Sequence, residues 1–75
     1  MKKILEYIVK ALVLKKDAVN ITESVDGNFI RYTVSVDKDD FGKVIGREGK
    51  IAKSIRSIMG AIATIKDVKV VIDIK

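Results

Sequence analysis

The sequence predicts an α+β fold: a two-layer sandwich in which a three-stranded sheet carries helices on one face, in the order α-β-β-α-α-β. Apolar residues recur at three- and four-residue spacings in residues 3–15 and 50–62, as on a buried helix face. They alternate with other residues in 19–36 and 68–75, as in half-buried strands. The chain has 75 residues, of which 48% are hydrophobic, which is enough for one packed core, so we expect a single domain over residues 1–75.

The first predicted helix, residues 3–15, is more apolar than one buried face requires, because nine of the eleven residues from 4 to 14 are hydrophobic. Glu6 and Lys10 lie one turn apart and are expected to form a favourable ion pair. Two explanations stay open. Either the helix packs deeply across the sheet, or part of it is a surface for self-association or for a partner.

Two alternating runs follow the first helix, and Asp26-Gly27 lies between them. This dipeptide is typical of the tight turn of an antiparallel hairpin, because such a turn requires positive φ angles, and Asn28 is positioned to lengthen the loop by one residue. The apolar positions of the second run are Ile30, Tyr32, Val34 and Val36.

The acidic cluster from Asp37 to Asp40 offers an N-cap for a short helix that Gly46 ends, and a longer helix is expected from about residue 50 to 62. We expect the apolar face of the longer helix to enter the core and its basic face to lie on the ligand side. The apolar face contains Ile51, Ile55, Ile58, Met59 and Ile62, and the basic face contains Lys50, Lys53 and Arg56. The final strand has Val68, Val70, Ile72 and Ile74 on its inner side.

The composition argues against catalysis. The chain has no cysteine and no histidine, so thiolate metal sites and the commonest general base are absent. A nucleotide-binding loop of the Walker A type requires glycine at position 44 and Ser or Thr at 51, where this chain has Val44 and Ile51. We therefore predict a protein that is not an enzyme, with no catalytic residue, no metal and no cofactor.

The apolar run from residue 4 to 14 is too short to cross a bilayer, and Glu6 and Lys10 interrupt it. We expect no membrane association and a cytoplasmic location.

The most informative motif is Gly46-Arg47-Glu48-Gly49. Two glycines three positions apart let the main chain approach phosphate oxygens, and the helix that follows adds free N–H groups. Such a GXXG turn, holding about four nucleotides, is typical of KH domains. The spacing alone also arises by chance, so the context matters: aliphatic residues flank the turn, and residues 43–56 contain five cations and one anion.

We therefore predict single-stranded RNA as the ligand, with main-chain N–H groups of the turn holding the RNA backbone while bases enter an aliphatic groove. Ile45, Ile51 and Ile55 are candidates for the helix side of this groove, and Val34 or Val36 for its strand side. The predicted RNA-binding residues are Lys43, Ile45, Gly46, Arg47, Glu48, Gly49, Lys50, Ile51, Lys53 and Arg56. A core position for Val34, Ile55 and Ile58, a solvated position for Lys53 and Arg56, and a purely structural role for the two glycines are the alternatives.

The element order and the stretch from residue 42 to 56 resemble the type II KH fold and, more closely, the KhpA family of small bacterial RNA-binding proteins, as does the segment 6–12. This resemblance implies a single KH domain that acts as an RNA chaperone or regulator. It also implies pairing with a second copy or with a larger KH-containing protein, KhpB. Many KH domains have a large aliphatic residue at the position of Ala52. The KhpA pattern departs from them in the same way as this chain, which has Ala52 there and Ile51 just before it. Glu48 is a second departure: its carboxylate repels phosphate, so we prefer Arg47 as the direct contact.

Two rival functions stay open on the sequence alone. A KH-like scaffold for protein interactions would use the basic turn only for solubility. Double-stranded DNA is a weaker alternative, because no helix carries the Asn, Gln and Arg set expected in a major groove.

Overall fold

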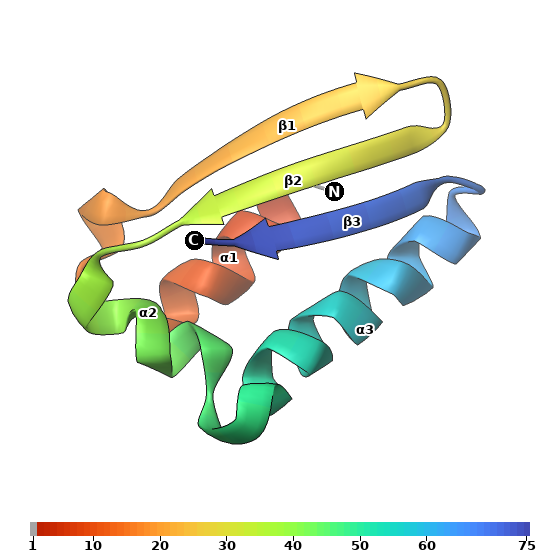
Figure 1. Cartoon of the computed structure of the whole chain (residues 1–75). Helices are drawn as coiled ribbons and strands as arrows, with labels where there is room; N and C mark the ends of the chain where they lie inside the picture. Colours follow the sequence, from red (N-terminus) through yellow and green to blue (C-terminus); the bar gives the residue numbers. More distant parts are fainter. Residues whose placement is uncertain (1) are drawn as a thin grey trace.

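Three helices lie on one face of a three-stranded sheet in the computed structural model, which describes residues 2–75 (Figure 1). The helices are α1 (Lys2–Leu12), α2 (Lys38–Ile45) and α3 (Lys50–Ile65), and the strands are β1 (Asn20–Asp26), β2 (Phe29–Ser35) and β3 (Lys69–Ile74). Two short 3-10 turns, η1 (Lys16–Ala18) and η2 (Arg47–Gly49), complete the order. The predicted α-β-β-α-α-β sandwich is confirmed.

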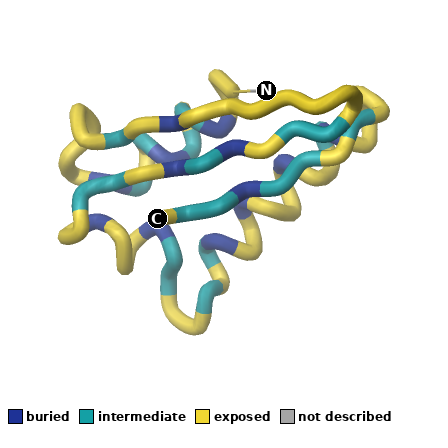
Figure 2. The backbone as a smooth tube through the Cα atoms, turned by 45° about the horizontal axis from the view of Figure 1, so that its top comes forward, coloured by how far each residue is buried: buried dark blue, intermediate teal, exposed yellow. Residues whose placement is uncertain are grey.

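The sheet has the order β1-β2-β3, with β1 antiparallel and β3 parallel to the central strand β2. Both β1 and β3 therefore have one open edge. β1 is almost entirely exposed, as Figure 2 shows, and Ile21 is its buried residue. The buried Tyr32 of β2 lies opposite Glu23 of β1. Burial, together with the Glu23 carboxylate, raises the pKa of Tyr32 to about 12.

The hairpin turn lies one residue later than predicted. Asp26 pairs with Phe29 as the last residue of β1, so Gly27 and Asn28 form the turn. Gly27 has φ +62°, whereas Asn28 does not have a positive φ. Positive φ at the first central position alone is the type II′ pattern, which favours glycine there and needs no special residue at the second position.

The core forms where the inner face of the sheet meets the three helices. Leu5 and Val9 of α1, Val44 of α2, and Ile55 and Met59 of α3 are all 2% exposed or less. Val13, Ile21, Tyr32, Val34 and Ile72 complete this cluster. The core positions predicted for Val34 and Ile55 are confirmed.

One core prediction was wrong, because Ile58 is 47% exposed. The buried stripe of α3 consists of Ala52, Ile55, Met59 and Ala63, so the helix is rotated relative to the predicted face. Two alanines in this stripe allow a close approach to the sheet. Ile51 and Ile62 remain half-buried at the edge of the stripe, and Ile58 lies beyond it.

The first helix ends at Leu12, three residues earlier than predicted. The reason lies in α2, where the carboxylate of buried Asp40 accepts hydrogen bonds from the backbone N–H groups of Leu14, at 3.2 Å, and Lys15, at 2.9 Å. These bonds hold the segment after α1 outside the helix. The Lys15 N–H group is also the main reason that the pKa of Asp40 is lowered.

The start of α2 follows the sequence prediction. Asp37 is the N-cap, and its side chain accepts a hydrogen bond from the backbone N–H of Asp39 at 2.9 Å. The helix ends at Gly46, whose N–H donates to the carbonyl of Gly42 at 2.8 Å. This places the turn toward α3 on the side of the molecule remote from the sheet (Figure 1).

Candidate nucleic-acid interface

The backbone between α2 and α3 is left-handed at three of four consecutive residues. Gly46 has φ 74° and ψ 174°, Glu48 has φ 57° and ψ 24°, and Gly49 has φ 73° and ψ 14°. A non-glycine residue in this region is uncommon and is often found at binding sites. The strain at Glu48 therefore marks this turn as a candidate site, in agreement with the motif.

The two glycines have different roles in this geometry. A Cβ atom on Gly46 would lie 2.6 Å from Cγ1 and 2.8 Å from Cβ of Ile51, so the fold itself requires glycine there. A Cβ atom on Gly49 would meet nothing within 4 Å. The missing side chain of Gly49 thus leaves open space beside the turn, which is where a ligand backbone has room to approach.

Three of the five backbone amides from Gly46 to Lys50 are used within the protein. The N–H groups of Gly46, Gly49 and Lys50 donate to carbonyls of Gly42, Gly46 and Arg47. Successive N–H groups at a turn can form an anion-binding concavity. The sequence analysis expected donors anywhere from Gly46 to Lys50, and the adjacent amides of Arg47 and Glu48 are the remaining candidates within the turn.

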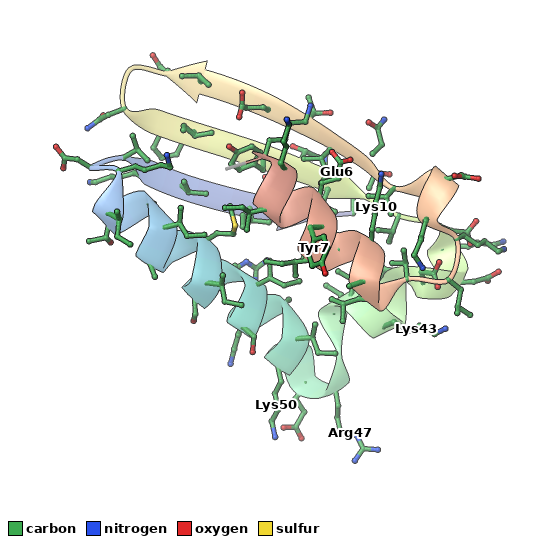
Figure 3. All side chains as sticks on the ribbon, turned by 180° about the vertical axis from the view of Figure 1, so that it is seen from behind. Glu6, Tyr7, Lys10, Lys43, Arg47 and Lys50 are labelled. Carbon is green, nitrogen blue, oxygen red and sulfur yellow. The ribbon has the colours of Figure 1, made fainter. Side chains whose placement is uncertain are left out.

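Not all predicted basic residues gather at the turn. Arg47 and Lys50 extend from its tip into solvent, whereas Lys43 projects from the side of α2 (Figure 3). Nζ of Lys43 lies 3.8 Å from Oδ1 of Asp40, so an acidic neighbour offsets part of its charge. Lys53 is exposed on α3. The basic side chains are thus spread over the tip of the turn, the side of α2 and α3.

Arg56 lies apart from the turn, on the flank of α3 that faces β3. Its Nε donates a hydrogen bond to the carbonyl oxygen of Ile72 at 3.3 Å. A pocket of about 210 Å³ lies here, lined by Arg56, Val70, Val71 and Ile72. Since β2 covers the other edge of β3, this pocket lies at the open edge of the sheet.

This pocket differs in its lining from the predicted groove. Its strand side is β3, whereas Val34 of the central strand is fully buried and Val36 is half-buried and packs against the core. On the helix side, Ile55 is 2% exposed and serves the core, while Ile45 and Ile51 are half-buried near the turn. The sequence did not predict a pocket beside β3, because alternation does not tell which strand occupies the edge of a sheet.

The fold and the glycine turn together define a KH-type domain, in which two helices joined by a GXXG turn pack on a three-stranded sheet. The chain belongs to the KhpA/KhpB KH-domain family, whose sequence model matches residues 2–74.

Relatives of full length agree with this assignment. The chain is 43% identical over 74 residues to the RNA-binding protein KhpA of Halalkalibacterium halodurans, covering 99% of this chain and 97% of that protein. It is also 43% identical to RNA-binding protein KhpA of Chlamydia trachomatis, with 99% and 95% covered. For RNA-binding protein KhpA of Clostridium perfringens the identity is 40%, with 99% of each chain covered. No solved structure matches the chain significantly.

None of the helices within residues 2–75 combines the length and the apolar character that crossing a membrane requires.

Proposed function

We propose that this protein, acting as a single KH domain, binds single-stranded RNA as a chaperone or post-transcriptional regulator in the cytoplasm and catalyses no reaction. The observation that carries this function is the turn backbone, which has positive φ at Gly46, Glu48 and Gly49 and sets the amides of Arg47 and Glu48 next to the open space at Gly49. The RNA-binding names of the KhpA relatives support the same ligand.

In this proposal the two amides donate to phosphate oxygens of the RNA backbone, and Gly49 leaves room for that backbone to pass. Arg47 and Lys50 add positive charge at the tip. The Glu48 side chain works against them, since a carboxylate repels phosphate, so this residue contributes through its main chain. Lys53 continues the positive flank along α3, toward Arg56.

The bases are expected to enter the pocket between α3 and β3. The open edge of β3 presents backbone donors and acceptors that no other strand uses, and Val70 and Val71 supply apolar surface. A grip on about four nucleotides neutralises few phosphates. If about three phosphates are neutralised, the association constant for RNA should fall by about two orders of magnitude per tenfold rise in salt concentration.

The clamp is tested by titrating the protein with a short oligouridylate while following its amide resonances. The largest shifts are expected at Arg47, Glu48 and Gly49. The double variant Arg47→Asp/Glu48→Asp should keep the fold and lose most of the affinity. Lys3→Asp, on α1, changes the net charge by the same amount far from the turn and serves as the matched control. Equal affinity of the two variants would refute the clamp.

A specific observation favours a protein partner in addition to RNA. Ile4 and Tyr7 of α1 are 43% and 79% exposed, and Ile58 of α3 is 47% exposed. Figure 3 shows Tyr7 on the side of α1 toward α3, whereas Glu6 and Lys10 lie on the opposite side, where they form a 3.0 Å ion pair. Exposed apolar residues on these two helices fit contact with a second copy of this chain or with a larger KhpB-like protein.

Such pairing would place two weak RNA sites on one complex and raise the effective concentration at the second site. Tyr7→Asp and Ile58→Asp should abolish self-association in analytical ultracentrifugation, and Tyr7→Asp should also abolish capture of a KhpB-like protein. Val25→Asp is the control, because Val25 is 59% exposed but lies on β1. If the first two variants bind RNA normally as monomers and lose no function in cells, the pairing proposal fails. If instead Arg47→Asp/Glu48→Asp has no effect on function in cells, whereas Tyr7→Asp and Ile58→Asp abolish that function, the protein acts as a scaffold for protein interactions.

A further inference from the structure

The guanidinium of Arg56 lies at the pocket between α3 and β3, and only one of its nitrogens donates a hydrogen bond there. Nε donates to the Ile72 carbonyl at 3.3 Å, which anchors the group to the open edge of the sheet. Within residues 2–75, its two terminal nitrogens, Nη1 and Nη2, form no hydrogen bond or ion pair, and Nε makes the hydrogen bond of this side chain. The planar end of the side chain thus carries free donors at a pocket that bears apolar walls.

The chemistry of this free end is selective. Guanidinium is planar, always charged and only donates hydrogen bonds, so its ideal partner presents two adjacent acceptors. Guanine offers O6 and N7 side by side, whereas in adenine the acceptor N7 lies next to the N6 donor. In uracil each carbonyl lies next to the N3 donor. Cytosine also presents neighbouring acceptors, but its single ring covers less of the apolar wall of Val70 and Val71.

We propose that Arg56 is a specificity-determining residue that selects guanine for the pocket between α3 and β3. The inference rests on the proposed RNA-binding function and adds a base preference to it. Ile72 fixes the orientation of the guanidinium through Nε, and the Nη1 and Nη2 pair meets O6 and N7 of the base.

The neighbouring surface of α3 leaves room for this base. Gly60 lies four residues after Arg56 on the same flank, and a Cβ atom built on Gly60 meets nothing within 4 Å. Glycine in the interior of a helix weakens the helix, and no close backbone approach within the protein explains its presence here. An open flank beside Arg56 gives Gly60 a role, because a flat purine needs clearance next to the pocket.

Four fluorescent tetranucleotides, UUGU, UUAU, UUCU and UUUU, test the proposal by fluorescence anisotropy with the full-length protein. UUGU is expected to bind about tenfold more tightly than UUAU and UUUU. Replacing its guanine by 7-deazaguanine, which lacks the N7 acceptor, should remove most of this advantage. In Arg56→Lys the charge is kept but the fork is lost, so this variant should bind UUGU no more tightly than it binds UUUU.

Lys53→Gln is the matched control, because it removes a charge from the same flank and should weaken all four RNAs to a similar extent. Equal binding of the four RNAs by the wild-type protein, a preference for adenine, uracil or cytosine, or a guanine preference that survives Arg56→Lys would each overturn the assignment of Arg56. If no RNA binds at all, the proposed function itself fails, which is a different result from binding without discrimination.

Discussion

The side chain of Ile51 occupies the space in which a side chain of residue 46 would lie, with its Cγ1 2.6 Å from the position of a Cβ on Gly46. This contact joins the end of α2 to the first turn of α3. It separates the two glycines of the turn into one that the fold needs and one that faces open space, and the two can be tested independently.

Replacing Gly46 by alanine should destabilise the protein by about 3 kcal/mol, because both the clash with Ile51 and the positive φ oppose it. Gly49→Asn should cost less than about 1 kcal/mol, since asparagine tolerates the left-handed conformation and nothing lies near its Cβ. Urea denaturation measures both. In an RNA titration Gly49→Asn should nevertheless bind weakly. A stable Gly46→Ala protein would contradict the contact described above.

Glu48 combines a left-handed backbone with an unfavourable charge, and two variants separate these effects. Glu48→Gln removes the charge and should raise RNA affinity without changing stability. Glu48→Gly should raise affinity similarly, and it also relieves a left-handed conformation that costs about 1 kcal/mol. The RNA dissociation constant and the denaturation midpoint of each variant, compared with those of the wild type, separate the effect of charge from the effect of the backbone. Weaker RNA binding by Glu48→Gln would show that the carboxylate itself contacts the ligand.

The lowered pKa of Asp40 predicts a loss of stability in acid. Because the folded-state pKa lies below the ordinary value of 3.8, the unfolded chain binds the proton more readily. The stabilisation by this carboxylate is therefore fully present above about pH 4 or 5 and is lost as the pH falls through the folded-state pKa. The melting temperature of the wild type should exceed that of Asp40→Asn at pH 7, and this difference should shrink as the pH falls below the ordinary pKa of 3.8. A difference in melting temperature that does not change with pH would show that ionisation of Asp40 is not its cause.

Gly60→Ala should raise the stability by about 1 kcal/mol, because α3 gains a better helix former where a Cβ has free space. If Gly60 serves the guanine pocket, the same variant should bind UUGU less tightly while its affinity for UUUU changes little. Thermal denaturation and the anisotropy assay provide the two measurements. A more stable protein with unchanged base preference would leave Gly60 without a role in binding.

Local patterns predicted much of this structure, because they depend on neighbouring residues. Asp37 caps α2 as expected, since an N-cap bond is made within three residues. The order of the elements and the glycine turn follow from the same kind of signal. The turn itself was recognisable, but the motif does not specify the positive φ of Glu48 between the two glycines.

Distant contacts caused the remaining differences. The early end of α1 results from Asp40, a residue more than twenty positions away in the sequence. The exposure of Ile58 depends on which flank of α3 meets the sheet, and two alanines decide this. The pocket beside Arg56 lies at β3 because that strand occupies one edge of the sheet. None of these contacts leaves a periodic pattern that a single sequence reveals.

The two open edges of the sheet have a consequence for the behaviour of the protein at high concentration. An unpaired strand edge can pair with the edge strand of another molecule, and repetition of this pairing builds fibrils. On β1 the exposed carboxylates of Glu23 and Asp26 make a like-charged edge that repels its own copy. On β3 the Arg56 side chain already covers one carbonyl. The same arginine that is proposed to read a base thus also takes up one acceptor of the edge to which a second β3 strand would pair.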